Sequence, residues 1–291
     1  MRRFEDIPME MMRSYSSAFS RRVFSDIINY GDFSHLDYLM KKWSPEVKDG
    51  DTYLMLLRQI YRAMCKNYRC EYVYKNEIIN KLLLNQFAGT RTVVFNEFRV
   101  ADSIVDLAMF NGVSKAFEIK TEYDSKKRLA HQLEIYSKLF QECYIVIPRE
   151  LYEYYTMDIS DTVGIVVMCV DRGQIRLSIE REAKKNDVVD PDILIKSVRC
   201  DEYKNIIKAH FGMIPEVSCY EMFDVCNALM HQIPCEILHS LFLKEIKSRV
   251  NNSNLLPHIP SEMRQMCLSL NLNRKQSEVL INELNTNIIT H

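Results

Sequence analysis

An Asn-Gly pair between two apolar runs is the feature that most constrains the fold of this chain. Asn111 and Gly112 separate residues 103–110 from residues 115–120, and both runs are rich in apolar side chains. Asn-Gly favours the tight turn that joins two antiparallel strands. Residues 92–100 form a third extended run directly before them. The sequence therefore predicts an antiparallel meander in the middle of the chain.

A helix is predicted on each side of this meander. Residues 75–87 have the helical period and end near Gly89. Their inward-facing side chains are predicted to be Ile78, Leu82 and Leu83. A second helical pattern runs from Asp124 to Phe140.

The segment after the second helix returns to strand-like patterns. An apolar run at 143–148 follows a helical connection long enough to place it parallel to the preceding strand. A short helix is expected at 149–157, followed by strands at 163–170 and 175–179. The expected fold class is α/β, with a mixed β-sheet flanked by helices.

Helical patterns also occupy both ends of the chain. Residues 1–70 contain two apolar stripes at helical spacing, with Asp51 and Thr52 as candidate helix caps. Further helices are expected near 200–211, 218–231, 234–250, 261–271 and 273–290. The predicted organisation is a helical N-terminal region (1–70), an α/β core (71–186) and a helical C-terminal region (187–291). The helical regions are candidate surfaces for a protein partner or a second copy of the chain.

Composition indicates the expected cellular compartment and limits the kinds of binding site. The chain has no apolar run long enough to cross a bilayer and no signal-peptide pattern, so we expect a cytoplasmic protein that does not contact membranes. Its nine cysteines form no C-x-x-C pair, which argues against structural zinc and favours reduced cysteines in the core. The formal net charge of -1 means that any nucleic-acid site must be local.

The predicted hairpin carries a group of charged residues. Glu118 and Lys120 lie two residues apart on one strand, so their side chains share a face. Asp106 lies on the partner strand, and a three-residue connection at 111–113 would place it directly opposite Glu118. A four-residue loop would shift this register.

Two carboxylates on an apolar hairpin repel each other unless a cation neutralises them. Mg²⁺ suits such a site because it binds one or two carboxylates and takes further oxygen ligands from substrate phosphate. Mn²⁺ is the alternative, and the backbone carbonyl of Ile119 is a further candidate ligand. Other E-x-K triplets begin at Glu46, Glu182 and Glu245, but only Glu118 lies in a strand-like run with an aspartate in the partner strand.

Residues 74–182 are predicted to contain a helix with Glu77, a strand, a strand with Asp106, a strand with Glu118 and Lys120, a helix and a further strand. This order of elements resembles the PD-(D/E)XK nuclease superfamily. The following helix adds Gln132 and Tyr136, a Q-x-x-x-Y pattern similar to that of RecB-like exonucleases. The chain also resembles poorly characterised bacterial families with an E-I-K strand and an R-L-x-x-Q helix. Val105 stands where the name-giving proline would be. The resemblance implies a restriction-endonuclease-like core.

The resemblance also implies roles for the site residues. Asp106 and Glu118 would bind the metal, and Lys120 would orient the attacking water or stabilise charge on the phosphate. Glu77 would reach the site from the first helix of the core. In the alternative interpretation, Lys120 simply pairs with Glu118 or Glu122.

The helix after the motif strand has two interpretations. Gln132 and Tyr136 would hold substrate or a motif carboxylate if they border the metal site, or would be core residues sharing a hydrogen bond. The three basic residues that open this helix would bind phosphates, or would be a solvated helix start. These are Lys126, Lys127 and Arg128.

The expected function is a metal-dependent nuclease that hydrolyses phosphodiester bonds with a Mg²⁺-activated water. DNA is the favoured substrate, in DNA repair or genome defence. The alternative is a catalytically inactive nuclease-fold module that binds nucleic acid or acts as a regulator, because fold does not imply function.

Overall fold

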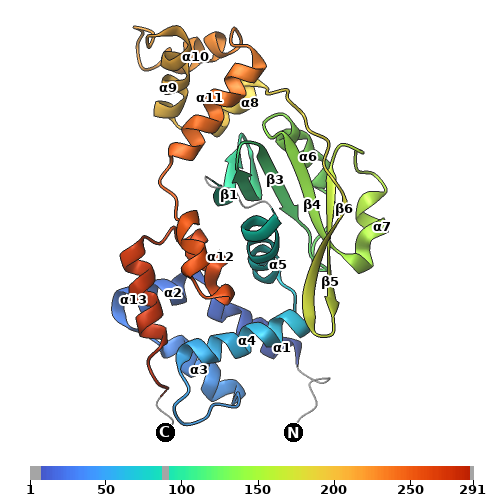
Figure 1. Cartoon of the computed structure of the whole chain (residues 1–291), viewed down its shortest axis with the longest axis vertical. Coiled ribbons are helices and arrows are strands. Elements are labelled where there is room, and N and C mark those ends of the chain that lie inside the picture. Colours follow the sequence, from blue (N-terminus) through green and yellow to red (C-terminus); the bar gives the residue numbers. More distant parts are fainter. Residues whose placement is uncertain (1–7, 87–91, 289–291) are drawn as a thin grey trace. The chain divides into compact units, whose positions relative to one another are not determined.

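The computed structural model describes residues 8–86 and 92–288, and these divide into two compact units (Figure 1). Unit 1 contains residues 8–86, 168–177 and 252–288, and unit 2 contains residues 92–167 and 178–251. The helical C-terminal region is therefore shared between the two units. Within the described residues, no helix is long and apolar enough to cross a membrane.

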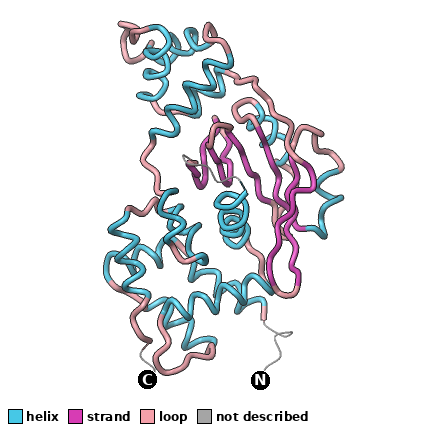
Figure 2. Tube along the Cα trace, in the orientation of Figure 1, coloured by secondary structure: helices cyan, strands magenta, loops and turns pink. Residues whose placement is uncertain are grey.

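A six-stranded mixed sheet confirms the predicted α/β class with helices flanking the sheet (Figure 2). Its strands lie in chain order, with β1–β2 and β2–β3 antiparallel and β3–β4 parallel. The strands are β1 (Val93–Val100), β2 (Ser103–Phe110), β3 (Ser114–Ile119), β4 (Glu142–Pro148), β5 (Gly164–Asp171) and β6 (Gln174–Arg181).

The hairpin between β2 and β3 has the three-residue connection and not the four-residue alternative. Phe110 lies opposite Ser114 and Leu107 lies opposite Phe117, so residues 111–113 form the turn. Gly112 has a φ of 112°, a value that favours glycine because it has no Cβ. The described pairs end at Leu107 and Phe117, one position before Asp106 and Glu118.

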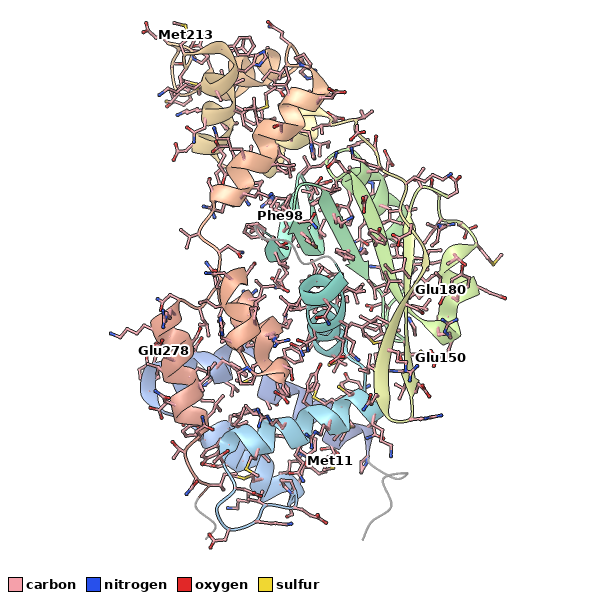
Figure 3. All side chains as sticks on the ribbon, in the orientation of Figure 1. Met11, Phe98, Glu150, Glu180, Met213 and Glu278 are labelled. Atoms are coloured by element: carbon pink, nitrogen blue, oxygen red, sulfur yellow. The ribbon has the colours of Figure 1, made fainter. Side chains whose placement is uncertain are left out.

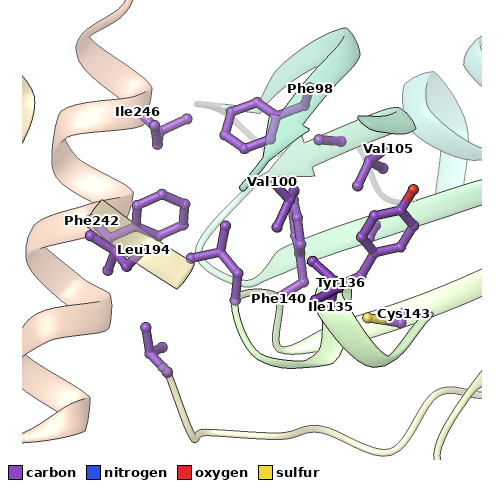
Figure 4. Packing of buried hydrophobic residues seen from close by; sticks show 14 of the residues in the cluster. Phe98, Val100, Val105, Ile135, Tyr136, Phe140, Cys143, Leu194, Phe242 and Ile246 are labelled. Atoms are coloured by element: carbon purple, nitrogen blue, oxygen red, sulfur yellow. The ribbon is translucent and has the colours of Figure 1, made fainter. Parts of the chain in front are cut away.

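Helices of unit 2 pack on the sheet around one apolar cluster (Figure 4). Phe242 and Ile246 from α11 and Leu194 from α8 join Phe98 and Val100 of β1 in this cluster. The helices of unit 2 are α6 (Leu129–Ser137), the 3₁₀ turn η3 (Arg149–Leu151), α7 (Tyr152–Thr156), α8 (Pro191–Ser197), α9 (Cys200–Phe211), α10 (Met222–Met230) and α11 (Cys235–Ser248).

The sequence patterns did not predict α8. This helix has only seven residues, too few to display a helical period. Its start is nevertheless strongly specified, since the Asp190 side chain accepts from the backbone N–H groups of Asp192 and Ile193, and Pro191 occupies the first turn.

Unit 1 is helical apart from the adjoining ends of β5 and β6. The predicted cap Thr52 accepts from Met55 N at the start of α4. Asn76 links α5 to the C-terminal segment, since its Nδ2 donates to Ser261 O and its Oδ1 accepts from Gln265 N. The helices are α1 (Met9–Ser16), η1 (Ser17–Phe19), α2 (Arg21–Tyr30), α3 (Ser34–Trp43), α4 (Tyr53–Asn67), α5 (Glu71–Ile78), the π-helix η2 (Ile79–Gln86), η4 (Ser253–His258), η5 (Ser261–Met263), α12 (Arg264–Ser269) and α13 (Arg274–Leu284).

The helix predicted at 75–87 begins earlier, at Glu71, and continues as a π-helix. Its predicted inward-facing residues are buried, as expected: Ile78, Leu82 and Leu83. Gly89, predicted to close this helix, lies outside the described residues.

The nine cysteines are free thiols, but they are not all core residues. The buried ones are Cys143, Cys226 and Cys267. The exposed ones are Cys200, Cys219 and Cys235, so the prediction of cysteines as core residues is correct for only part of the set.

Candidate active site

The candidate site lies where regular strand pairing is interrupted. Along the described β1–β2 ladder, Asn96 pairs with Leu107 and Phe98 pairs with Val105, and the ladder skips the position between them. That position holds Glu97 on β1 and Asp106 on β2. Glu97 has a φ of 57°, in the left-handed region that non-glycine residues rarely adopt. The β1–β2 ladder is therefore irregular at this position.

The burial pattern shows the same break. Strict alternation along a strand places residues an even number apart on one face. Val105 and Ala108 are three residues apart, yet both belong to the same apolar cluster. The regular alternation of side chains along β2 is therefore interrupted near Asp106.

Asp106 uses this break to contact the neighbouring strand with its side chain. The last described backbone pair between β2 and β3 joins Leu107 to Phe117. One position further on, the Asp106 Oδ2 accepts a hydrogen bond of 2.8 Å from Ile119 N. The carboxylate thus takes a place that a backbone carbonyl would occupy in a regular ladder.

Glu118 is the buried acid of the site, with 2% of its surface exposed. Its Oε1 lies 2.6 Å from Lys120 Nζ. Burial and the neighbouring Asp106 carboxylate raise the pKa of Glu118 to about 7, while Lys120 acts in the opposite direction. Glu118 therefore has both a second carboxylate and an ammonium as neighbours.

Helix α6 holds both members of the Glu118–Lys120 pair. Gln132 accepts from Lys120 Nζ at 3.1 Å through its Oε1. The Tyr136 hydroxyl lies 3.0 Å from Glu118 Oε2 and 2.6 Å from Ile104 O. A hydroxyl has one proton to donate, so these two acceptors share it unless Glu118 is itself protonated.

Tyr136 is also part of the core. It is fully buried, and Figure 4 shows it within the apolar cluster. Burial raises the pKa of its hydroxyl, which keeps that group protonated as a donor. The two interpretations of this residue are therefore compatible, because its ring packs in the core while its hydroxyl contacts a motif carboxylate.

The segment after Lys120 corrects the predicted start of the helix. The Thr121 N and Oγ1 donate to Asp124 Oδ2 at 2.8 and 2.7 Å, and the Tyr155 hydroxyl donates to Asp124 O at 3.0 Å. Such side-chain bonds compete with helix formation, so α6 begins only at Leu129. The sequence analysis did not predict these hydrogen bonds, although the T-x-x-D spacing of Thr121 and Asp124 is a recognisable turn signal.

The three basic residues therefore precede the helix and do not open it. Lys126 pairs with Asp158 at 2.8 Å. Lys127 and Arg128 are exposed, and Arg128 is the residue that precedes the first turn of α6.

Glu77, the remaining predicted site residue, lies in α5 of unit 1. Its Oε1 accepts from the Tyr61 hydroxyl at 2.7 Å, and its Oε2 lies 3.1 Å from Lys81 Nζ. Asn76 donates to the same tyrosine hydroxyl at 2.8 Å.

The carboxylate and carbonyl oxygens at the site are atoms of the kind that bind a hard cation. Across residues 8–86 and 92–288, no group of three or more His, Cys, Asp and Glu side chains is arranged to hold a metal. Asp106 and Glu118 nevertheless form a pair of like-charged carboxylates, with the Ile119 backbone between Glu118 and Lys120. Carboxylate and carbonyl oxygens are the ligands that Mg²⁺ and Mn²⁺ prefer.

The fold and this cluster define an α/β protein with a buried carboxylate–lysine group at a break in a mixed sheet. A family model described as Bacteriophage P4 protein cII matches residues 64–269, and the chain belongs to this family. Protein cII of Enterobacteria phage P4 is 28% identical over 158 residues, which cover 54% of this chain. The chain thus matches 59% of the length of that relative.

Among solved structures, a protein of unknown function from Silicibacter pomeroyi has 13% identity and a TM-score of 0.29. The match covers 39% of this chain and 75% of that one.

Proposed function

We propose that this chain is a metal-dependent nuclease of the PD-(D/E)XK type, which hydrolyses phosphodiester bonds with DNA as the favoured substrate. The observation that carries the proposal is the buried Glu118–Lys120 pair beside Asp106, held by Gln132 and Tyr136 from α6. A structural ion pair alone would not need a second carboxylate beside it, because that carboxylate raises the cost of burying the first.

Asp106 and Glu118 would hold Mg²⁺ or Mn²⁺, together with the backbone carbonyl of Ile119. When bound, the cation would polarise the phosphate and lower the pKa of a water molecule. Glu77 is less suited to this task, because its two oxygens already contact Tyr61 and Lys81.

Lys120 supplies a positive charge next to the carboxylates. Its ammonium has three hydrogens, of which two are directed to Glu118 and Gln132. The third can donate to a phosphate oxygen or to the attacking water, where a positioned charge stabilises the transition state. Gln132 and Tyr136 keep Lys120 and Glu118 in place for this role.

A second candidate is an inactive nuclease-fold module that binds nucleic acid or regulates another process. The direct 2.6 Å contact between Lys120 and Glu118 favours it, because mutual neutralisation weakens attraction for a cation. Metal-dependent turnover distinguishes the two candidates.

The test incubates the full chain with end-labelled linear DNA, circular DNA, branched DNA and RNA, in Mg²⁺, Mn²⁺ or EDTA. We expect cleavage with either metal, no cleavage in EDTA, and loss of cleavage in Asp106→Asn. Asp102→Asn is a matched control, since this aspartate is mostly exposed on the β1–β2 turn. Binding of nucleic acid without cleavage under every condition would favour the inactive module.

A further inference from the structure

Unit 2 contains a pocket of about 530 Å³ between β1, the β1–β2 turn, α6 and α8. Two isoleucines give it an apolar part, and its charged residues are two cations and one carboxylate. The lining residues are Arg99, Ala101, Asp102, Ile135, Ile193 and Lys196. Three segments of the chain therefore bring two cations to one concave surface of a size that suits a small organic group.

Hydrogen bonds hold the walls of this pocket in place. Ala101 N donates to Ser197 Oγ at 3.0 Å, which joins the β1–β2 turn to α8. The Ser197 hydroxyl donates to Ile193 O at 2.6 Å. Arg99 Nε donates to Ala101 O at 3.0 Å, which fixes the guanidinium at the turn and leaves its terminal nitrogens available as donors. The pocket therefore needs no ligand to hold its walls together.

The two cations are not consumed by ion pairs. Arg99 is exposed, although it directly follows the buried Phe98, which is labelled in Figure 3. Lys196 is also exposed, and the acid one turn before it, Asp192, is bonded to Asn227. Within the described part of the chain, neither cation has a carboxylate at ion-pair distance. Two exposed cations that line one pocket are suited to an anionic ligand, and most of all to a phosphate.

Asp102 is the carboxylate of the lining, and it lies toward α6. Its Oδ2 is 3.9 Å from Nε2 of His131, and its side chain is 73% exposed. A carboxylate repels a phosphate, so Asp102 is not part of the anion contact.

The pocket is connected to the buried Glu118 by a short series of contacts. Arg99 is the cross-strand partner of Ile104, and such partners lie about 5 Å apart. The Ile104 carbonyl accepts from the Tyr136 hydroxyl at 2.6 Å. The same hydroxyl lies 3.0 Å from Glu118 Oε2. A few nucleotides of one strand can bridge this separation, since each adds about 3.4 Å or more.

We propose that this pocket is a phosphate-binding subsite for the substrate strand, in which Arg99 and Lys196 hold a phosphate close to the one that is cleaved. The sugar of that nucleotide packs on Ile135 and Ile193. This inference rests on the proposed nuclease function and adds a subsite that positions its substrate. The connection to Glu118 favours a nucleic-acid strand over an acidic peptide as the anionic ligand.

The test measures binding of the full chain to fluorescein-labelled oligo-dT by anisotropy, in EDTA so that binding is separated from cleavage. Lys196→Ala and Arg99→Ala should each raise the Kd roughly fivefold at low salt, the upper range for one exposed ion pair. Each should also make the slope of log K against log salt concentration shallower by about 0.7, the value for one phosphate contact with a single strand. Arg99→Lys should retain the slope, because the charge remains.

Lys208→Ala is the matched control, since this lysine is exposed on α9 of the same unit. Asp102→Asn should bind at least as tightly as the unchanged chain, because it removes a negative charge beside the phosphate. A strand with uncharged methylphosphonate linkages should bind weakly and equally to the unchanged chain and to both alanine variants.

An unchanged Kd and salt slope in Lys196→Ala, or the same loss in Lys208→Ala, would overturn the subsite. Weaker binding of a polyglutamate peptide to both alanine variants, with oligo-dT binding unaffected, would assign the pocket to an acidic peptide instead. The nuclease proposal fails separately, by absent cleavage in Mg²⁺ and Mn²⁺ while the binding differences in EDTA remain.

Discussion

Each unit contains a buried glutamate between a tyrosine hydroxyl and a lysine, but the two clusters differ in charge. In unit 1, Glu77 contacts Tyr61 and Lys81, so one carboxylate meets one ammonium. In unit 2, Glu118 contacts Tyr136 and Lys120, and Asp106 adds a second carboxylate. The unit 1 cluster places one carboxylate beside one lysine, whereas the unit 2 cluster places two carboxylates beside each other.

The difference also concerns where the partners come from. Glu77 and Lys81 lie four residues apart along one helical segment, a spacing that brings side chains together without tertiary packing. The unit 2 cluster joins residues from β2, from β3 and its end, and from α6. Neighbouring carboxylates assembled from several elements are typical of functional sites, while a glutamate–lysine pair on one helical segment needs only a structural explanation.

The largest expected effect distinguishes the two glutamates directly. Glu118→Gln should lower metal-dependent cleavage on the order of 10³-fold, because it removes a ligand and a charge at the reacting centre. Glu77→Gln should lower stability and leave the cleavage rate within about threefold. Single-turnover cleavage and thermal unfolding of both variants provide the measurement, and equal loss of cleavage in the two would contradict the comparison.

The lysines should differ in the same way. Lys120→Ala is expected to reduce the cleavage rate roughly 10²-fold with little change in metal affinity, since its ammonium acts on the transition state. Lys81→Ala removes the partner of Glu77 and a donor to Ile175 O, and it should leave the rate unchanged. Titration calorimetry with Mn²⁺ separates the two effects. Lost metal binding with a retained rate at saturating metal would show that Lys120 has another role.

The pH dependence of stability should differ between the Glu118 cluster and the Glu77 cluster. In EDTA, Glu118 has a pKa of about 7 in the folded chain against an ordinary value of 4.5. A raised carboxyl pKa means that the folded state binds the extra proton, so stability should fall on the order of 2 kcal/mol as the pH rises from about 4.5 to about 7.

Hydrogen exchange of β3 amides measures this loss in unit 2, and fluorescence of the single tryptophan, Trp43, follows unit 1. The loss should disappear in Glu118→Gln and persist in Glu77→Gln. An unchanged pH profile in Glu118→Gln would assign the effect to another group.

The smallest effects are expected from the tyrosine hydroxyls. Tyr136→Phe and Tyr61→Phe each remove a buried hydrogen bond and should cost about 1 kcal/mol of stability. Only Tyr136→Phe, and similarly Gln132→Ala, should also lower cleavage, because these residues hold Glu118 and Lys120. A stability loss without any change in specific activity would make the α6 contacts purely structural.

Sequence patterns predicted most strands correctly and several helices with shifted ends. The β2–β3 hairpin was predicted with β3 shifted by one residue and with the loop length left open, because Asn-Gly and period-2 alternation are local signals. The start of α6 was wrong because the Thr121 and Asp124 side chains bond within the turn. Val105 and Ala108 gave no indication of the strand break at Asp106, since such a break depends on packing against other elements.

The sequence by itself determined which charged residues share a strand face, because backbone geometry places Glu118 and Lys120 on the same side of β3. Only the tertiary structure decided what those residues contact. The bond from Ile119 N to Asp106, the contacts of Gln132 and Tyr136, and the bond from Tyr61 to Glu77 all join groups from segments that local periodicity cannot bring together. Spacing along the chain fixes direction within an element, whereas contacts between elements follow from the packing of the whole unit.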